Sequence, residues 1–158
     1  MKKVLVILTI FGIDRLSKIY LINLQSSGTD IDFYILPFLN FYLMWNTGIG
    51  FGLISLESNI YYHLLTFIIL LINCFLIFLL FKTKGSYQNL IAIIIGGSLG
   101  NLFDRVYYSA VPDFIDINYQ GFHWFVFNIA DIFISLGIIC LITSELFLKK
   151  ESINKTNE

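Results

Sequence analysis

The chain has 158 residues, of which 57% are hydrophobic and only 13% are charged, and its mean hydropathy is +0.78. A soluble domain usually carries about 25% charged residues, so this composition indicates an integral membrane protein of one compact domain. The net charge is −1, and no basic cluster is larger than a pair of lysines, which argues against a nucleic-acid partner.

Four apolar runs approach or exceed the roughly 20 residues that a membrane-spanning helix needs. They predict helices over residues 4–24, 60–81, 87–103 and 127–148. The first run resembles a signal peptide, but charged residues interrupt it and no small-x-small cleavage site follows, so we expect a retained helix. Residues 1–150 are then expected to form one four-helix transmembrane domain, and residues 151–158 a polar cytoplasmic tail that we expect to be disordered.

Two charged residues of the first helix are placed to interact. Asp14 and Lys18 are four positions apart, so they share a face of the helix and can form an ion pair. Pairing reduces the cost of burying either charge in a membrane. Two interpretations stay open at this point: a structural ion pair between helices, or a part of a functional site.

The segment between the first two helices is too polar and too broken to span a membrane. Aromatic and aliphatic residues are dense over residues 33–45, which predicts short strands lying on the membrane surface. Pro37 excludes a regular helix there, and Trp45 suits the headgroup layer. Glycines that permit close backbone approach follow at Gly48, Gly50 and Gly52.

The lysines predict the orientation, because positive residues near the ends of spanning helices stay on the cytoplasmic side. The pairs are Lys2/Lys3, Lys82/Lys84 and Lys149/Lys150, and all flank one side of a four-helix arrangement. Both termini are therefore expected in the cytoplasm. The opposite, outer side receives Asp30, Asp32, Glu57, Asp113 and Asp116. The predicted fold class is an all-α membrane protein with a small β element, in which an extracytoplasmic strand-rich cradle and a surface loop join four helices.

Polar residues cluster where the third and fourth apolar runs should meet water. Asn101, Asp104 and Arg105 share one face of the third helix, and Asn128 and Asp131 share one face of the fourth. Polar groups are costly in a bilayer, so ionisable residues kept at these positions are candidates for a functional site.

Asp113 lies in the segment between these two clusters. Pro112 holds the preceding residue extended and ends any helix, which predicts that Asp113 sits on a strand-like segment. If the third and fourth helices are neighbours, Asp113 can fold back toward Asp131. Two half-buried carboxyl groups lose their protons in two coupled steps, so one stays protonated while the other is charged. Such a pair suits peptide hydrolysis: the ionised carboxylate activates water, and the protonated one polarises the carbonyl and then protonates the leaving amine.

Other interpretations of these residues are open. Asp104 and Arg105 could form an interfacial ion pair, with Asp113 and Asp131 acting only as helix-boundary residues. A small proton-coupled transporter could use Asp104, Asp113 and Asp131 as a relay, although no internal repeat with broken helices is evident. A non-catalytic membrane scaffold would leave the outer acidic clusters unexplained.

The segment GGSLG at 96–100 matches the G-x-S-x-G pattern of nucleophilic serines, but that motif requires a strand-to-helix turn. Here the segment lies inside an apolar helical run, so Gly96 and Gly100 indicate a small-xxx-small packing face. Two histidines and two cysteines without metal-ligand spacing predict neither a metal site nor a cofactor.

Five blocks in order resemble the lipoprotein signal peptidases (signal peptidase II), a family of bacterial intramembrane aspartyl proteases, over about residues 11–148. The blocks are DRLSK at 14–18, ILPFLNFYLMWNTGIGFG at 35–52, GGSLGNLFDR at 96–105, VPDFID at 111–116 and FNIADIFI at 127–134. Any one block is weak evidence, whereas five in order together with four helices are highly specific.

The resemblance implies that Asp113 and Asp131 are the catalytic pair. Positions that shape the site, or hold the substrate or the pair, are Asn46, Gly48, Asn101, Asp104, Arg105, Asn128 and Ala130, and Asp14 and Lys18 match the polar pair of the first helix. Ile49 and Gly50 replace alanines and Pro112 replaces an aliphatic residue, departures that bear on cradle shape and inhibitor affinity more than on chemistry.

The family also implies the substrate and the location. It cleaves diacylglyceryl-modified prolipoproteins just before the lipidated cysteine, and it is the target of globomycin. The implied protein is a monomer without cofactors that contacts membrane lipids. It lies in the bacterial cytoplasmic (inner) membrane as a multi-pass protein, with its active site toward the extracytoplasmic face.

Overall fold

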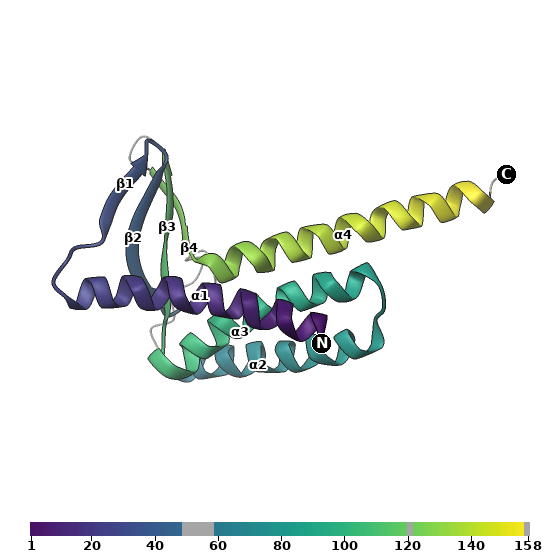
Figure 1. Cartoon of the computed structure of the whole chain (residues 1–158), viewed down its shortest axis with the longest axis horizontal. Helices are drawn as coiled ribbons and strands as arrows, with labels where there is room; N and C mark the ends of the chain where they lie inside the picture. Colours follow the sequence, from purple (N-terminus) through teal and green to yellow (C-terminus); the bar gives the residue numbers. More distant parts are fainter. Residues whose placement is uncertain (49–58, 120–121, 157–158) are drawn as a thin grey trace.

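The computed structural model describes residues 1–48, 59–119 and 122–156 of the chain. Its elements in chain order are α1 (Lys2–Ser26), β1 (Asp32–Leu36), β2 (Leu39–Asn46), α2 (Asn59–Lys82), α3 (Ser86–Tyr108), β3 (Val111–Tyr119), β4 (Phe122–Phe127) and α4 (Ile129–Thr156). The sheet stands at one end of the helices, and the N-terminus and the α2–α3 connection lie at the other end (Figure 1). Of the predicted site region, Ile49, Gly50 and Gly52 fall outside the described residues, as does Glu57.

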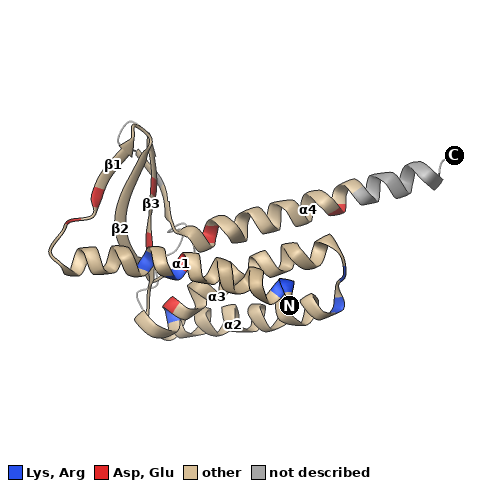
Figure 2. Cartoon of the chain, in the orientation of Figure 1, with Lys and Arg blue, Asp and Glu red and all other residues tan. Residues whose placement is uncertain are grey.

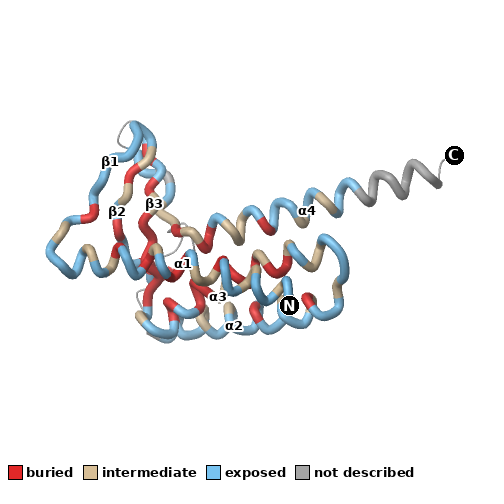
Figure 3. Tube along the Cα trace, in the orientation of Figure 1, coloured by how far each residue is buried: buried red, intermediate tan, exposed pale blue. Residues whose placement is uncertain are grey.

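Helix α3 is the centre of the molecule, because it contacts α1, α2 and α4. In the 18-residue stretch of α3 that is apolar enough to cross a membrane, 61% of the residues are buried, against 11% in α2 and 17% in α4. The sequence reflects this difference: α2 has a mean hydropathy of 3.0 with apolar residues all round, whereas α3 has 1.3 and carries polar residues. A polar residue is tolerated in α3 because protein, rather than lipid, surrounds it. Buried positions accordingly gather along α3 and at its junction with the sheet (Figure 3).

Among the described residues, three helices are long and apolar enough to cross a membrane: Ile60–Lys82, Ser86–Tyr108 and Ile129–Phe147. Helix α1 has the necessary length but is not among them, since Asp14, Arg15 and Lys18 lie in its interior. The prediction of four spanning helices is therefore supported by composition for three of them.

The glycines of GGSLG lie inside α3, so the prediction of helix packing rather than a nucleophile turn is confirmed. A β-carbon on Gly96 would lie 2.9 Å from Ile10 Cβ of α1, and one on Gly100 would collide with the Asp14 carboxylate. On the neighbouring face, a β-carbon on Gly97 would lie 2.6 Å from the carbonyl oxygen of Ala130 in α4. These glycines let three helix backbones approach closely beside the candidate aspartates.

The four strands form one antiparallel sheet in the order β1-β2-β3-β4. The predicted strands over 33–45 are thus confirmed as the β1–β2 hairpin, which turns at Pro37 and Phe38. Strand β3 carries Asp113, as predicted, and β4 had not been predicted. A core of Leu21, Ile31, Leu43 and Phe114 attaches the sheet to α1.

Two helices continue past their predicted ends. Helix α3 extends to Tyr108 and stops at Ser109, whose φ of 57° lies in the left-handed region. Helix α4 extends through Thr156, whereas the sequence predicted a helix end near residue 148 and a disordered tail over residues 151–158. No glycine or proline follows Gly137, so nothing in the sequence breaks that helix. The division into a domain and a cytoplasmic tail stays a prediction.

Candidate active site

Asp113 and Asp131 approach each other at the junction between the sheet and the helices, and one residue, Asn128, holds both. Asn128 Nδ2 donates to Asp113 Oδ1 at 2.6 Å, and its backbone N–H donates to Asp131 Oδ2 at 3.2 Å. The side chains of Asp113 and Asp131 come from β3 and from the first turn of α4. Both residues are buried, at 1% and 8% exposure, and Asn128 is fully buried.

The local sequence explains this geometry. Asn128 precedes the first residue of α4, and its Oδ1 accepts a hydrogen bond from the Asp131 N–H at 3.1 Å. Asn is a preferred helix N-cap, and a carboxylate three residues later that bonds back to the cap N–H completes a reciprocal capping arrangement. The segment Asn128-Ile-Ala-Asp131 therefore starts the helix and fixes the Asp131 carboxylate by the same contacts.

The second oxygen of Asp113 is held from β2. Asn46, at the end of that strand, donates from Nδ2 to Asp113 Oδ2 at 2.8 Å, and its own Oδ1 accepts from the Gly48 N–H at 2.8 Å. Arg105 donates from Nη2 to the Gly48 carbonyl at 2.9 Å. The Arg105 backbone carbonyl in turn accepts from the Tyr62 hydroxyl of α2 at 3.0 Å. Arg105 thus positions the turn that positions Asn46.

The second oxygen of Asp131 is held from α3. Asn101 Nδ2 donates to Asp131 Oδ1 at 2.8 Å, and Asn101 Oδ1 accepts from Lys18 Nζ at 2.8 Å. All four carboxylate oxygens of the pair therefore have a hydrogen-bond donor. Neither carboxyl group can rotate freely, which keeps the pair in one geometry.

Lys18 is the centre of a buried charge cluster behind Asn101. Its Nζ donates to Asp14 Oδ2 at 2.8 Å and to Asp104 Oδ2 at 2.7 Å, and Arg15 pairs with the other oxygen of Asp104. Asp14 Oδ1 accepts from the Ala130 N–H of α4 at 3.0 Å. Two cations and two anions balance one another, and such pairing is what makes a buried charge tolerable. The predicted Asp14–Lys18 pair is confirmed, and it joins α1 to α3 and α4.

One of the alternatives drawn from the sequence is wrong. Asp104 pairs with Arg15 and Lys18 of α1, and Arg105 bonds to the Gly48 carbonyl, so no Asp104–Arg105 ion pair exists between these two described residues. Neighbours in sequence point to different partners because successive helical residues are rotated by about 100°. Arg15 was missed as a member of the cluster, and its position beside Asp14 in the DRLSK block was the available signal.

The electrostatics of Asp113 differ from those of a surface aspartate. Burial, and then the neighbouring Asp131 carboxylate, raise the pKa of Asp113 from 3.8 to about 6, against the opposing effect of the Asn46 and Asn128 hydrogen bonds. A carboxyl group with this pKa can hold or release a proton near neutral pH, which general acid–base chemistry requires. The arrangement can therefore activate a water molecule on one carboxylate while the other carboxyl group donates a proton.

Comparisons with known proteins agree on one family. The family model described as "Signal peptidase (SPase) II" matches residues 6–147. The lipoprotein signal peptidase of Pelagibacter ubique is 47% identical over 152 residues, which cover 96% of this chain and 92% of that protein. The lipoprotein signal peptidase of Anaplasma phagocytophilum is 36% identical over 154 residues, with 96% and 95% coverage. A structure solved at 2.3 Å and described as a bacterial membrane enzyme is also similar: it is 29% identical, has a TM-score of 0.70, and covers 98% of this chain and 91% of its own.

Proposed function

Because the chain belongs to the signal peptidase II family, whose members are aspartic peptidases that remove signal peptides from prolipoproteins, we propose that Asp113 and Asp131 are its catalytic pair. The observation that carries this assignment is Asn128, whose side chain and backbone bind both carboxylates. The relay expected of a transporter has no support, since Asp104 is bound by Arg15 and Lys18.

Hydrolysis proceeds without a covalent intermediate in this proposal. The ionised carboxylate of the pair removes a proton from water as the water attacks the scissile carbonyl. The protonated carboxyl group donates a hydrogen bond to the carbonyl oxygen and later delivers its proton to the leaving amine. Asn46, Asn101 and Asn128 keep the two groups aimed at the substrate. Six further residues support those three asparagines and the start of α4: Gly48, Arg105, Asp14, Lys18, Asp104 and Ala130.

The substrate in this proposal is a diacylglyceryl-modified prolipoprotein, cut immediately before its lipidated cysteine. All four helices, α1 included, cross the bacterial cytoplasmic membrane, with both termini in the cytoplasm. Figure 2 supports this orientation: the positive N-terminal end and the α2–α3 connection lie opposite the sheet, which carries acidic residues. The pair then opens toward the extracytoplasmic face, where a signal helix leaves the membrane. In this proposal the protein acts as a monomer in contact with membrane lipids.

The test of this activity is cleavage by the purified protein in lipid. A lipidated prolipoprotein should yield a product whose mass begins at the modified cysteine, and the same precursor without its diacylglyceryl group should not be cut. Globomycin should block the reaction by occupying the site. An intact lipidated precursor, in a preparation shown to be folded, would contradict the proposed function.

A further inference from the structure

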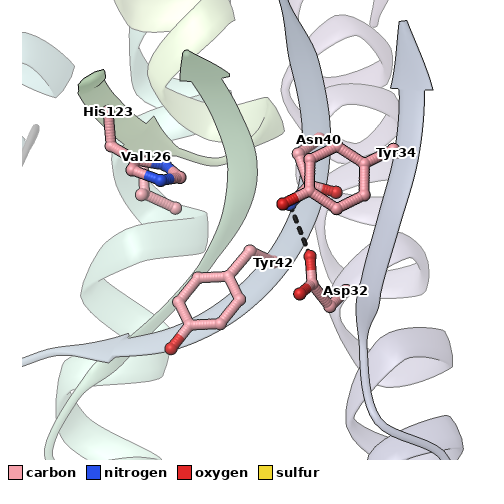
Figure 4. A pocket seen from close by; sticks show the side chains of 6 residues that line it. All are labelled: Asp32, Tyr34, Asn40, Tyr42, His123 and Val126. Atoms are coloured by element: carbon pink, nitrogen blue, oxygen red, sulfur yellow. Dashed lines mark hydrogen bonds between the residues drawn. The ribbon is translucent and has the colours of Figure 1, made fainter. Parts of the chain in front are cut away.

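A second polar pocket lies on the sheet, and none of the site residues described above lines it. Its walls come from three strands, with Asp32 and Tyr34 on β1, Asn40 and Tyr42 on β2, and His123 and Val126 on β4. The side chains surround an open space with β1 and β2 on one side and β4 on the other (Figure 4). The volume is about 390 Å³, within the range of small-ligand sites.

One residue of the pocket wall carries a buried hydrogen-bond acceptor that lacks a donor. Asn40 is only 2% exposed, and its Nδ2 donates to Asp32 Oδ1 at 2.6 Å. Its Oδ1 has no hydrogen-bond partner among the described residues. Asp116, the cross-strand neighbour of Asn40, is fully buried. Its Oδ2 lies 2.7 Å from His123 Nδ1, whereas its Oδ1 likewise has no partner in the described part of the chain. Burying an acceptor without a donor is costly, so the Asn40 oxygen at the pocket wall indicates a ligand that supplies a donor.

The chemistry of the walls favours a cation. Asp32 contributes a carboxylate, and no lysine or arginine is among the residues that line the pocket. Tyr34 and Tyr42 are 73% and 49% exposed as residues, and the faces of their rings can contact a cation. The described residues include no group of three His, Cys, Asp or Glu side chains placed to hold a metal ion. An organic ammonium or guanidinium group, which brings several N–H donors, fits the acceptors and the rings together.

The pocket is connected to the candidate active site by two strands. Asp116 follows Asp113 by three residues on β3, and Asn40 lies on β2, the strand that ends at Asn46. Three residues of strand correspond to roughly 10 Å. An extended chain cut beside Asp113 therefore reaches the pocket within a few residues. The portion of a substrate near the sheet is the mature segment, because the apolar signal helix stays beside the membrane helices.

We propose that this pocket binds a lysine or arginine side chain of the prolipoprotein, a few residues to the mature side of the cleaved bond. The proposal rests on the proposed function and adds a specificity subsite to it. Asp32 provides the charge, Asn40 accepts a hydrogen bond, and Tyr34 and Tyr42 flank the cationic group.

The test compares matched lipidated substrates that carry either lysine or acetyl-lysine about three to five residues after the cysteine. Wild-type protein should cleave the lysine substrate with a kcat/KM roughly five- to tenfold higher than that for the acetyl-lysine substrate. This ratio is expected for a cation held by a carboxylate and aromatic rings. Asp32→Asn keeps an acceptor for Asn40 but removes the charge, and it should reduce this ratio toward one. Tyr34→Leu should also reduce it. Asp30→Asn is the matched control, because Asp30 is exposed and does not line the pocket, and it should retain the ratio.

A wild-type ratio of one would overturn the subsite while leaving the peptidase assignment intact. An equal loss in Asp30→Asn and Asp32→Asn would also overturn it, because diffuse surface charge would then explain the preference. Vesicles with and without phosphatidylethanolamine separate the sources of ammonium: an Asp32-dependent response to the lipid, with no response to the peptide lysine, would assign the pocket to headgroups instead. Equilibrium binding of the two peptides to the Asp113→Asn protein tests the subsite without turnover, and equal Kd values would reject it.

Discussion

At the scale of single residues, the candidate site depends on three asparagine side chains, each of which donates from its NH₂ group and accepts at its oxygen. Asn128, Asn46 and Asn101 each donate to a carboxylate of the pair. Asn128 and Asn46 use their oxygens to accept a backbone N–H, whereas the oxygen of Asn101 accepts from Lys18. An asparagine fixed at its oxygen presents its NH₂ in one direction, so the carboxylates are oriented by side chains that are themselves oriented. An aspartate in these positions would introduce like charge beside the pair.

The pKa of Asp113 should respond in opposite directions to two substitutions. Asn46→Ala removes a hydrogen bond to the ionised form, so the pKa should rise above about 6. Asp131→Asn removes a neighbouring negative charge, so the pKa of Asp113 should fall toward its ordinary value. Infrared titration of the carboxyl band, assigned with the Asp113→Asn protein, would measure both. Shifts of the same sign in the two variants would show that Asp131 does not act on Asp113 as described.

At the scale of elements, α1 is attached to the rest of the protein by charge as well as by apolar packing. Lys18 bonds to Asp14 in its own helix and to Asn101 and Asp104 in α3. The close approach that permits these bonds depends on Gly96 and Gly100, which face α1. Helix α1 is the least apolar of the helices that we propose to span the membrane, and its charges are buried against protein.

Removing the buried cation should be strongly destabilising. Lys18→Met leaves Asp14 and Asp104 without their shared partner, and breaking a buried pair typically costs about 3–5 kcal/mol. Thermal unfolding in detergent should show a large fall in Tm. Lys3→Met is the control, since the interaction that Lys3 makes among the described residues is an exposed hydrogen bond to Asn89. Equal Tm values for the two variants would contradict the role given to Lys18.

Two glycine substitutions separate packing from helix propensity. Gly100→Ala places a methyl group against the Asp14 carboxylate and should destabilise the protein by about 1–3 kcal/mol. Gly12→Ala meets nothing within 4 Å and should be neutral or slightly stabilising, because alanine favours a helix more than glycine does. Unfolding in denaturant would compare them. A Gly100→Ala protein as stable as Gly12→Ala would argue against tight packing of α1 on α3.

The elements also explain what could be predicted from the sequence. Apolar runs were sufficient to predict the helices, because hydrophobic length is a local property of the sequence. Pro37 helped to predict the β1–β2 hairpin, because its missing backbone donor excludes a regular helix there. Strand β4 was missed, since its short aromatic segment, FHWFVF, leads almost directly into an apolar helix. The partner of Asp104 could not be predicted: Arg15 is 89 positions away, and local spacing favoured Arg105. The predicted proximity of Asp113 to Asp131 is consistent with their shared contact, Asn128.

At the scale of the whole molecule, chemistry and orientation are linked. The sheet lies at one end of the helices, and the lysine-bearing N-terminus lies at the other (Figure 2). The aspartate pair belongs to the sheet end, since Asp113 is on β3 and Asp131 is in the first turn of α4. A prolipoprotein inserts with the positive end of its signal helix inside, so the bond to be cut emerges on the outer side. The enzyme can reach that bond only if its sheet faces outward.

Cysteine labelling in intact cells would test this orientation. In a Cys74→Ser/Cys140→Ser background, a cysteine at Asp30 should react with a membrane-impermeant thiol reagent, and one at Lys84 should react only after the membrane is opened. Both positions are exposed, whereas Asp116, also expected on the outer side, is fully buried and unsuitable. Labelling of position 84 from outside, with position 30 protected, would invert the proposed topology.

If Asp113 and Asp131 together perform the hydrolysis, as we propose, turnover should be lost in each of the two single Asp→Asn proteins. Each substitution preserves the shape of the side chain but removes its ability to exchange a proton. Asp113→Asn and Asp131→Asn should each lower kcat on a lipidated prolipoprotein by about 100- to 10,000-fold. Both proteins should remain folded in the membrane, and Asp30→Asn should retain wild-type turnover. Near-normal cleavage by a well-folded Asp113→Asn or Asp131→Asn protein would contradict the assignment.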